Sequence, residues 1–247
     1  RCDQVLEGLS MDIQTYLNRP IPRSDDRGLG NPFPDAAECG EAIVDITNAN
    51  PRIAYAASYA ARGVQGGLTH CYVRAGVYER LKAALDLLPE EYSFLIYDTL
   101  RPLRVQEALF EEYIEVLKKE HPQADREELE EICDEFVAKP SKNQLRPSSH
   151  QSGGAVDLTL CRDGAPLDMG TAFDEFAPIA YADAFEKPGM DETVCQNRRL
   201  LHNVMCDVGF TFYESEWWHF NYGNESWARR NFCAPIYSFC ADAPNLI

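Results

Sequence analysis

The sequence predicts an α+β fold, in which helices flank a small, largely antiparallel sheet. Amphipathic helical patterns cover much of the chain, whereas apolar runs of strand length are few and short. Two of these runs, residues 211–213 and 217–222, stand close together and favour a closing pair of strands. Helices packed on one such sheet give an α+β architecture.

The first 40 residues are expected to form a helix and an extended arm. Residues 3–17 place apolar side chains on one helical face: Leu6, Leu9, Ile13 and Leu17. Residues 18–40 are rich in Pro, Gly and Asp, which is typical of a surface loop. Because no second core pattern is visible in this stretch, we expect it to be an extension of a single domain over residues 41–247.

The next part of the chain predicts two strands and one helix. Residues 42–46 and 92–97 are apolar runs of strand length. Residues 48–67 contain Pro51 and several glycines and are expected to form an irregular loop. Residues 75–88 carry apolar side chains at helical spacing, and the proline that follows ends the pattern.

Three further helices and one central strand complete the prediction. Helical patterns span residues 102–120 and 125–137, with a proline at the start of the first. The apolar run 156–160 predicts the central strand. The last helix is expected over residues 193–208, where Gly209 provides the C-terminal stop.

Charge and hydropathy exclude some classes of partner. The chain has 40 acidic and 23 basic residues and a net charge of −17, which argues against nucleic-acid binding. No apolar run approaches the length needed to span a membrane. The acidic charge is suited to a protein that handles a small substrate, and with 45% hydrophobic residues the chain can bury a sizeable core. Its oligomeric state stays open.

Nine cysteines are present, and none forms a C-x-x-C pair typical of a structural zinc site. Cys2, Cys39, Cys233 and Cys240 lie in loop-like terminal regions and would pair in an oxidising compartment. Free thiols are the alternative. Because the sequence starts without methionine, an export signal removed upstream is one interpretation, and cytoplasmic and exported locations both stay open.

A histidine and an aspartate stand seven positions apart in the middle of the chain. His150 and Asp157 supply imidazole nitrogen and carboxylate oxygen, and a catalytic zinc site takes three such ligands and leaves one position open. Residues an odd number apart on a strand point to opposite faces. We therefore expect a turn or bulge at Gly153-Gly154. The candidate for the third ligand is His219.

Glu216 precedes this third histidine by three positions. A glutamate beside a zinc site can take a proton from the attacking water and later deliver it to the leaving amine. The aromatic residues Trp217, Trp218 and Phe220 favour a strand, so we expect Glu216 at a strand start or bulge. An exposed carboxylate beside core tryptophans is the alternative.

Arg101 follows the predicted strand 92–97 and precedes Pro102, so it should lie at the mouth of that strand. Its guanidinium is permanently charged and has directional donors, which suit an oxyanion on a scissile carbonyl. A structural ion pair is the alternative, and Asp98 is the candidate partner. Of the remaining histidines, His70 is kept as a candidate at the rim of the site.

These motifs together resemble the D-alanyl-D-alanine dipeptidases, the zinc peptidase family that includes the vancomycin-resistance dipeptidase. The resemblance runs from about residue 95 to residue 222, and several motifs occur in the family's order. It rests on Tyr97-Asp98-x-x-Arg101-Pro102, Ser148-x-His150-x-x-Gly153-x-Ala155-x-Asp157, Met169-Gly170-x-x-Phe173-Asp174, Gln196-Asn197-Arg198-Arg199 and Glu216-x-x-His219.

The resemblance implies a dipeptidase with one zinc ion and a small dipeptide substrate. It implies that His150, Asp157 and His219 bind the zinc. It further implies that Glu216 is the general base and acid, while Arg101 stabilises the oxyanion.

The same resemblance implies two substrate contacts. Asp174 would pair with the free α-amino group of the dipeptide, and an anion there would reject N-blocked peptides. Ser148 would help to fix the substrate or the loop that carries the ligand His150. A capping or turn residue is the alternative at both positions.

Residues 55–67 match the family poorly, so the substrate is less constrained than the metal chemistry. The expected function is zinc-dependent hydrolysis of D-Ala-D-Ala or a related short D,D-dipeptide in cell-wall metabolism. The alternatives are a D,D-carboxypeptidase or another peptidoglycan peptidase with the same site, and a non-catalytic zinc-binding module.

Overall fold

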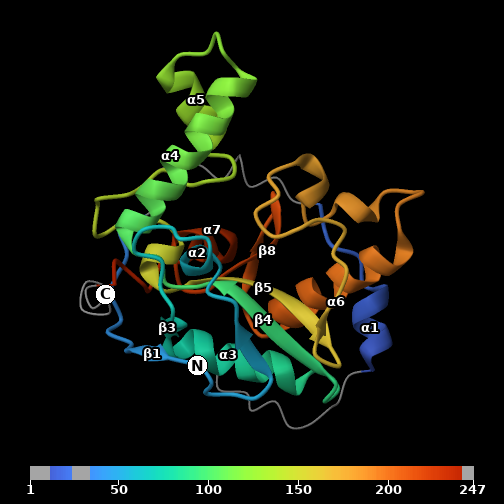
Figure 1. Ribbon diagram of the computed structural model, residues 1–247. Helices are drawn as coiled ribbons and strands as arrows, with labels where there is room; N and C mark the ends of the chain where they lie inside the picture. The colour runs from blue at the N-terminus through green and yellow to red at the C-terminus, as the bar shows by residue number, and fades with distance from the viewer. Residues whose placement is uncertain (1–11, 24–33, 241–247) are drawn as a thin grey trace.

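A computed structural model of the chain describes residues 12–23 and 34–240. A six-stranded sheet lies at its centre (Figure 1). Five of its strands run in the order β2-β4-β5-β8-β7, and the sixth, β6, pairs with β5. Its strands are β2 (Ile53–Tyr55), β4 (Tyr92–Asp98), β5 (Ala155–Arg162), β6 (Ala165–Pro166), β7 (Thr211–Tyr213) and β8 (Glu216–Asn221). A separate antiparallel pair joins β1 (Ile43–Asp45) to β3 (Tyr72–Arg74).

The helices lie around this sheet and on a projection above it (Figure 1). They are α1 (Ile13–Asn18), α2 (Ser58–Ala61), α3 (Ala75–Asp86), α4 (Leu103–Glu120), α5 (Arg126–Cys133), α6 (Glu192–Asp207) and α7 (Glu225–Asn231), with 3-10 turns η2 (His150–Ser152), η3 (Pro178–Ala180) and η4 (Ala184–Glu186). α3 and α6 contact each other beside the sheet, and α1 packs on α6. α4 and α5 project away from the body.

The strands β5 and β8 are buried on both faces, and most of their side chains are apolar or aromatic. Every residue of β5 except Arg162 is buried, and so is every residue of β8. The main core joins β4, β5 and β8 to α3 and α6, with Phe94, Leu158 and Leu201 among its fully enclosed side chains. Polar residues on these strands are therefore shielded from water, which strengthens their electrostatic interactions.

A second apolar cluster forms where α2 and the residues after it meet α4 and α5. Tyr59 and Val64 pack there with Leu109, Phe110 and Leu129. α5 begins with a capping box, in which Asp125 accepts from the backbone and Glu128 bonds back. The helices α4 and α5 are thus held together by this second apolar cluster.

The predicted α+β class is confirmed, and so are the predicted strands and the long helices. In the sheet, β2 and β4 are parallel, whereas the other strand pairs are antiparallel. The predicted helix over residues 3–17 is seen only as α1, because residues 1–11 lie outside the described residues. α5 ends at Cys133, a few residues before the predicted end. The division of the chain at residue 40 stays a prediction.

The irregular loop predicted over residues 48–67 is wrong. This stretch contains β2 and α2, which have three and four residues. Elements this short carry too few residues to show a period, and α2 follows Ala57, whose φ is 49°. β3 and α7 were also not predicted from the sequence.

Cys39 and Cys233 carry free thiols at exposed positions, so the predicted pairing does not involve them; Cys2 lies outside the described residues. No helix within residues 12–23 and 34–240 combines the length and apolar character needed to cross a membrane.

Candidate active site

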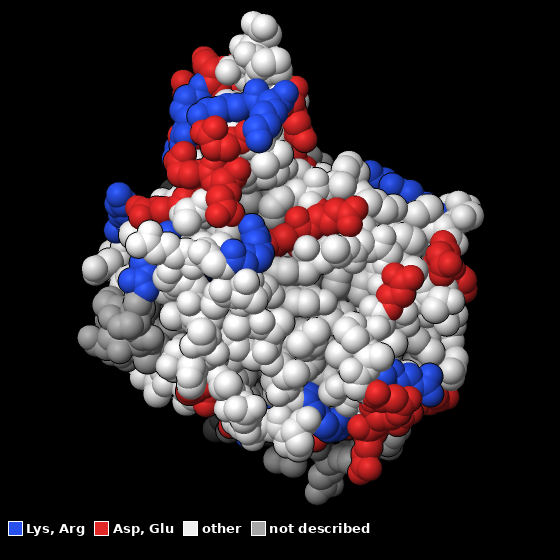
Figure 2. Space-filling view, viewed as in Figure 1, with Lys and Arg blue, Asp and Glu red and all other residues white. Residues whose placement is uncertain are grey.

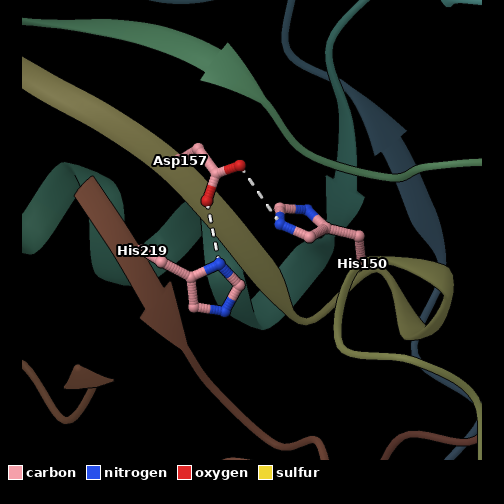
Figure 3. Close-up of side chains that lie close together, drawn as sticks. All are labelled: His150, Asp157 and His219. Atoms are coloured by element: carbon pink, nitrogen blue, oxygen red, sulfur yellow. Dashed lines mark hydrogen bonds and ion pairs between the residues drawn. The ribbon is translucent and has the colours of Figure 1, made fainter. Parts of the chain in front are cut away.

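Three buried side chains form a compact group on the central strands (Figure 3). One ligand-type atom from each of His150, Asp157 and His219 lies within 4.8 Å of the other two. His150 Nε2 is 3.2 Å from Asp157 Oδ2, and His219 Nδ1 is 2.9 Å from Asp157 Oδ1. The structure therefore brings together the three residues that the sequence proposed as metal ligands.

The backbone explains how residues seven positions apart meet. Asp157 on β5 lies directly opposite His219 on β8 in the antiparallel register. His150 begins the 3-10 turn η2, and Gly153 ends this turn with a φ of 72°, a conformation that favours glycine. The chain thus reverses before β5 begins, and the predicted turn at Gly153 is confirmed.

Oxygen acceptors fix the outer nitrogens of both imidazoles. His150 Nδ1 lies 2.7 Å from the carbonyl oxygen of Thr99, which can only accept. His219 Nε2 lies 3.1 Å from Asn221 Oδ1, which also accepts from the side-chain amide of Asn224 at 2.7 Å. Both outer nitrogens therefore carry hydrogen and donate, and both rings are held in place.

The inner nitrogens of the two rings, His150 Nε2 and His219 Nδ1, both face the carboxylate of Asp157. Burial opposes ionisation of Asp157, but His150 and His219 lower its pKa below the usual range. A donor set of two nitrogens and one carboxylate suits Zn²⁺, so the residues fit this metal.

Glu216 is the first residue of β8, and its Oε2 lies 3.7 Å from His219 Nδ1. The pairing of β7 with β8 shifts register between Phe212 and Tyr213, which lets two residues three positions apart approach the same region. The expected strand start beside a bulge is confirmed. Burial raises the pKa of the Glu216 carboxyl well above its usual value, and the charge of Asp157 adds to this shift.

Arg101 lies just beyond β4 and is buried, with its donors directed by fixed partners. Its Nε donates to Asp98 Oδ2 at 2.8 Å, and its Nη1 donates to Gln106 Oε1 at 2.8 Å. Its Nη2 reaches Asp157 Oδ2 at 3.5 Å. The proposed contact between Asp98 and Arg101 is confirmed, and the guanidinium lies beside the candidate metal ligands.

Asp174 lies in the loop before η3, with a φ of 61°. Its Oδ1 accepts from the Tyr59 hydroxyl at 3.3 Å, and its Oδ2 accepts from Arg62 Nη1 at 3.1 Å. Burial raises the pKa of the Asp174 carboxyl to about 7, although Arg101 opposes the rise. Asp174 is therefore a sheltered carboxyl that titrates close to neutral pH.

All these groups line one cavity of about 630 Å³, which also reaches Ser148 and the wall formed by α4 and the residues after α5. A cavity of this size is typical of small-molecule sites. The Ser148 hydroxyl donates to Gln151 Oε1 at 2.8 Å, and its backbone nitrogen donates to the same oxygen. Ser148 thus both lines the cavity and fixes the turn that carries His150.

Several residues of the site had no signal in the sequence. Thr99 acts through its backbone carbonyl, so its side chain gave no clue. Tyr59 and Arg62 lie in the stretch interpreted as loop. Asn221 could have been found, because it stands two positions after His219 and shares its strand face.

His70 lies elsewhere and is not at the rim of this cavity. It lines a separate hollow of about 220 Å³ with residues 66–69, Tyr72 and Arg104. Its Nδ1 is 2.7 Å from Asp45 Oδ2 at the surface. The two-stranded sheet β1–β3 ends beside it, which explains why it is held away from the central strands.

Comparison with known proteins identifies the family. The sequence model described as D-Ala-D-Ala dipeptidase matches residues 45–237. The chain belongs to this family of peptidases. Two relatives named D-alanyl-D-alanine dipeptidase agree with this assignment. The protein from Synechocystis sp. is 30% identical over 211 residues, covering 77% of this chain and 85% of that protein. The protein from Enterococcus faecium is 32% identical over 172 residues, covering 65% and 79%.

Solved structures with a distant likeness come from D,D-peptidases of vancomycin resistance. A mutant of the D,D-pentapeptidase VanY in complex with Zn(II) has a TM-score of 0.39 and 16% identity, covering 69% of this chain and 83% of that chain. VanYB in complex with D-Ala-D-Ala has a TM-score of 0.40 and 16% identity, covering 69% and 82%. Similarity at this level supports no conclusion about the ligands of this dipeptidase-family chain.

Proposed function

We propose that this chain is a zinc-dependent dipeptidase that hydrolyses D-Ala-D-Ala or a related short D,D-dipeptide in cell-wall peptide metabolism. The observation that carries this proposal is the convergence of three buried metal-type donors, Glu216 and Arg101 on one cavity. Within the described part of the chain, the donor group has three members, which suits a catalytic zinc site with an open position. The family and the names of its members support the substrate.

One zinc ion would be held by His150 through Nε2, by His219 through Nδ1 and by the carboxylate of Asp157. When bound, zinc supplies Lewis-acid polarisation of the peptide carbonyl and lowers the pKa of water. The acceptors on the outer nitrogens, Thr99 and Asn221, keep both rings turned towards the ion and favour its retention.

Glu216 serves as the general base and then as the general acid. Its carboxylate accepts a proton from the attacking water and passes this proton to the amine that leaves. Burial raises its pKa, so the ionised form is a stronger proton acceptor than a carboxylate in water. Its position at the start of β8 holds it on the wall of the cavity beside His219.

Arg101 stabilises the negative charge that develops on the carbonyl oxygen. Its Nε and Nη1 are occupied by Asp98 and Gln106 at 2.8 Å, which fixes the plane of the guanidinium. Its Nη2 makes longer contacts and lies beside Asp157, so we assign this nitrogen to the oxyanion. A donor that is already oriented requires little rearrangement as the charge forms.

Asp174 and Ser148 are assigned to the substrate. The carboxylate of Asp174 pairs with the free α-amino group of the dipeptide, which explains a preference for unblocked peptides. Both side chains line the cavity that holds the candidate metal ligands. The Ser148 hydroxyl also donates to Gln151, which limits its movement.

The deciding experiment measures D-alanine release from D-Ala-D-Ala and from its N-acetylated analogue, each with and without a metal chelator. Cleavage of the free dipeptide alone, abolished by the chelator and restored by zinc, is the expected result. Equal cleavage of the acetylated analogue would favour a carboxypeptidase. Absence of cleavage of both, with zinc bound at one ion per chain, would favour a binding module.

A further inference from the structure

Tyr59 lies between the group assigned to the oxyanion and the group assigned to the substrate amine. Its side chain is buried, with a relative exposure of 5% for the residue. Arg101 Nη2 donates to the Tyr59 hydroxyl at 3.2 Å, and the hydroxyl donates to Asp174 Oδ1 at 3.3 Å. One phenol therefore contacts both assigned groups.

The direction of this hydrogen-bond chain follows from the chemistry of its members. A guanidinium has only donors, so the Tyr59 oxygen must accept from Arg101. The single hydroxyl hydrogen is then available for Asp174, whose ionised carboxylate can only accept. With Asp174 ionised, the hydrogen bonds run in one direction, from Arg101 through Tyr59 to Asp174.

We propose that Tyr59 is a positioning residue that holds Arg101 and Asp174 in one arrangement, so that hydrolysis depends on a free substrate amine. This inference rests on the proposed function and names a determinant of its specificity. A substrate ammonium bound at Asp174 is placed at a fixed offset from the guanidinium that stabilises the oxyanion. These hydrogen bonds would thus place the α-amino group of the substrate and the carbonyl of its scissile bond together.

Packing around the ring keeps the hydroxyl in place. The guanidinium of Arg101 lies 4.9 Å from the centre of the Tyr59 ring, and the ring of Phe173 lies 6.1 Å away. Tyr59 also belongs to the apolar cluster formed with α4 and α5. The hydroxyl is therefore carried by a side chain that has little room to swing.

The other partner of Asp174 is less suited to this task. Arg62 is 49% exposed in its side chain and divides its guanidinium between Asp174 and Glu112 of α4. Ion pairs this exposed contribute little to stability and are screened by salt. The sheltered hydroxyl of Tyr59 is thus the contact that fixes the carboxylate.

The first test compares Tyr59→Phe with Tyr78→Phe. Tyr59→Phe keeps the ring and its packing but removes the hydroxyl that bonds two charged groups. We expect kcat/KM for D-Ala-D-Ala to fall by roughly 10- to 100-fold, with both a lower kcat and a higher KM. Tyr78 lies on α3, and Tyr78→Phe removes a hydroxyl that donates to the carbonyl of Ala49, so kcat/KM should stay within about twofold.

The second test separates positioning from a general structural role. Calorimetry on the Glu216→Gln protein, with and without Tyr59→Phe, measures Kd for D-Ala-D-Ala and for N-acetyl-D-Ala-D-Ala. We expect Tyr59→Phe to weaken binding of the free dipeptide by about tenfold and to leave the acetylated analogue nearly unchanged. Unfolding temperatures should match between the two proteins.

Three results would overturn the inference. Equal weakening for both ligands would indicate a structural role, and unchanged kcat/KM and Kd would indicate none. Absence of binding of the free dipeptide to the Glu216→Gln protein would also overturn it. Failure of the wild-type chain to cleave D-Ala-D-Ala would refute the proposed function by itself, while the binding comparison would still decide the role of Tyr59.

Discussion

The cavity has two sides that are built differently. The metal side consists of buried residues on paired strands and the turn that leads into them: His150 on η2, Asp157 on β5 and His219 on β8. The substrate side consists of short elements and loops, with Tyr59 and Arg62 on or after α2 and Asp174 at a positive φ. Cross-strand pairing fixes the first side, whereas side-chain contacts hold the second.

We therefore expect metal binding to depend on paired strands and substrate recognition to depend on short elements and loops. The proposed metal ligands lie on the sheet and the turn before it, whereas the residues proposed to recognise the substrate lie on short elements and loops. Figure 2 shows acidic and basic side chains gathered on the α4–α5 projection, whereas much of the visible body is uncharged.

The largest effect should come from Glu216→Gln. Loss of the general base should lower kcat by about 10²- to 10⁴-fold, because proton transfer contributes on this order. Zinc content, measured by atomic emission after gel filtration, should stay at one ion per chain, since Glu216 is not among the three donors. Retention of activity within tenfold, or loss of the metal, would contradict the separation of base and ligands.

Arg101→Lys should have the next largest effect and should act on kcat. Lysine keeps the charge but cannot bond Asp98, Gln106 and Tyr59 at once, so the oxyanion donor loses its orientation. We expect kcat to fall by about 10²- to 10³-fold in steady-state assays. Arg104→Lys is the matched control because Arg104 lines the separate hollow, and it should change kcat by less than about twofold.

Sequence patterns were sufficient for the metal side because the signal there is local and chemical. His150 and Asp157 flank a glycine that the turn requires, and Asp157 lies on β5, a strand of which every residue except Arg162 is buried. Cross-strand placement of His219 opposite Asp157 could not be derived from the sequence, since register depends on pairing with β8. The motifs nevertheless pointed to three residues that the fold brings together.

The substrate side was harder to predict because its elements are short and their partners are distant. β2 has three residues and joins β4 in parallel, so no hairpin signal announces it. Tyr59 lies 42 positions from Arg101 and 115 from Asp174, and nothing in the local sequence relates them. Tyr59 packs with residues of α4, and Asp174 comes from a distant loop, so these residues meet at the cavity only in the folded chain.

Asn221→Ala should affect metal affinity more than chemistry. The side chain orients His219 by accepting from its outer nitrogen at 3.1 Å, and such contacts are worth about 10- to 100-fold in metal affinity. Competition with a fluorescent zinc chelator should reveal this loss, while kcat at saturating zinc falls less. Asn231→Ala removes an exposed bond to the Trp227 carbonyl and serves as the control. Equal affinities for the two variants would show that His219 needs no such support.

The smallest effect is expected from Asp174→Asn, which should increase stability, whereas the substitutions above should lower activity or metal affinity. Burial raises the pKa of Asp174 to about 7, against about 3.9 in an unfolded chain, so the folded state holds an extra proton between these values. Stability of the metal-free wild-type chain therefore falls as pH rises from about 4 to about 7 and stays lower above it.

Asp174→Asn removes this penalty, because asparagine does not ionise. A shift of this size corresponds to at most about 4 kcal/mol, and loss of the ion pair with Arg62 offsets part of it. We expect the metal-free variant to be roughly 1–3 kcal/mol more stable than wild type at pH 8 by urea unfolding, and to show little advantage at pH 4. An equal gain in stability at pH 8 and pH 4 would mean that ionisation of Asp174 does not destabilise the folded state. A gain confined to high pH, with weaker binding of the free dipeptide, would show that the substrate side gives up stability for recognition.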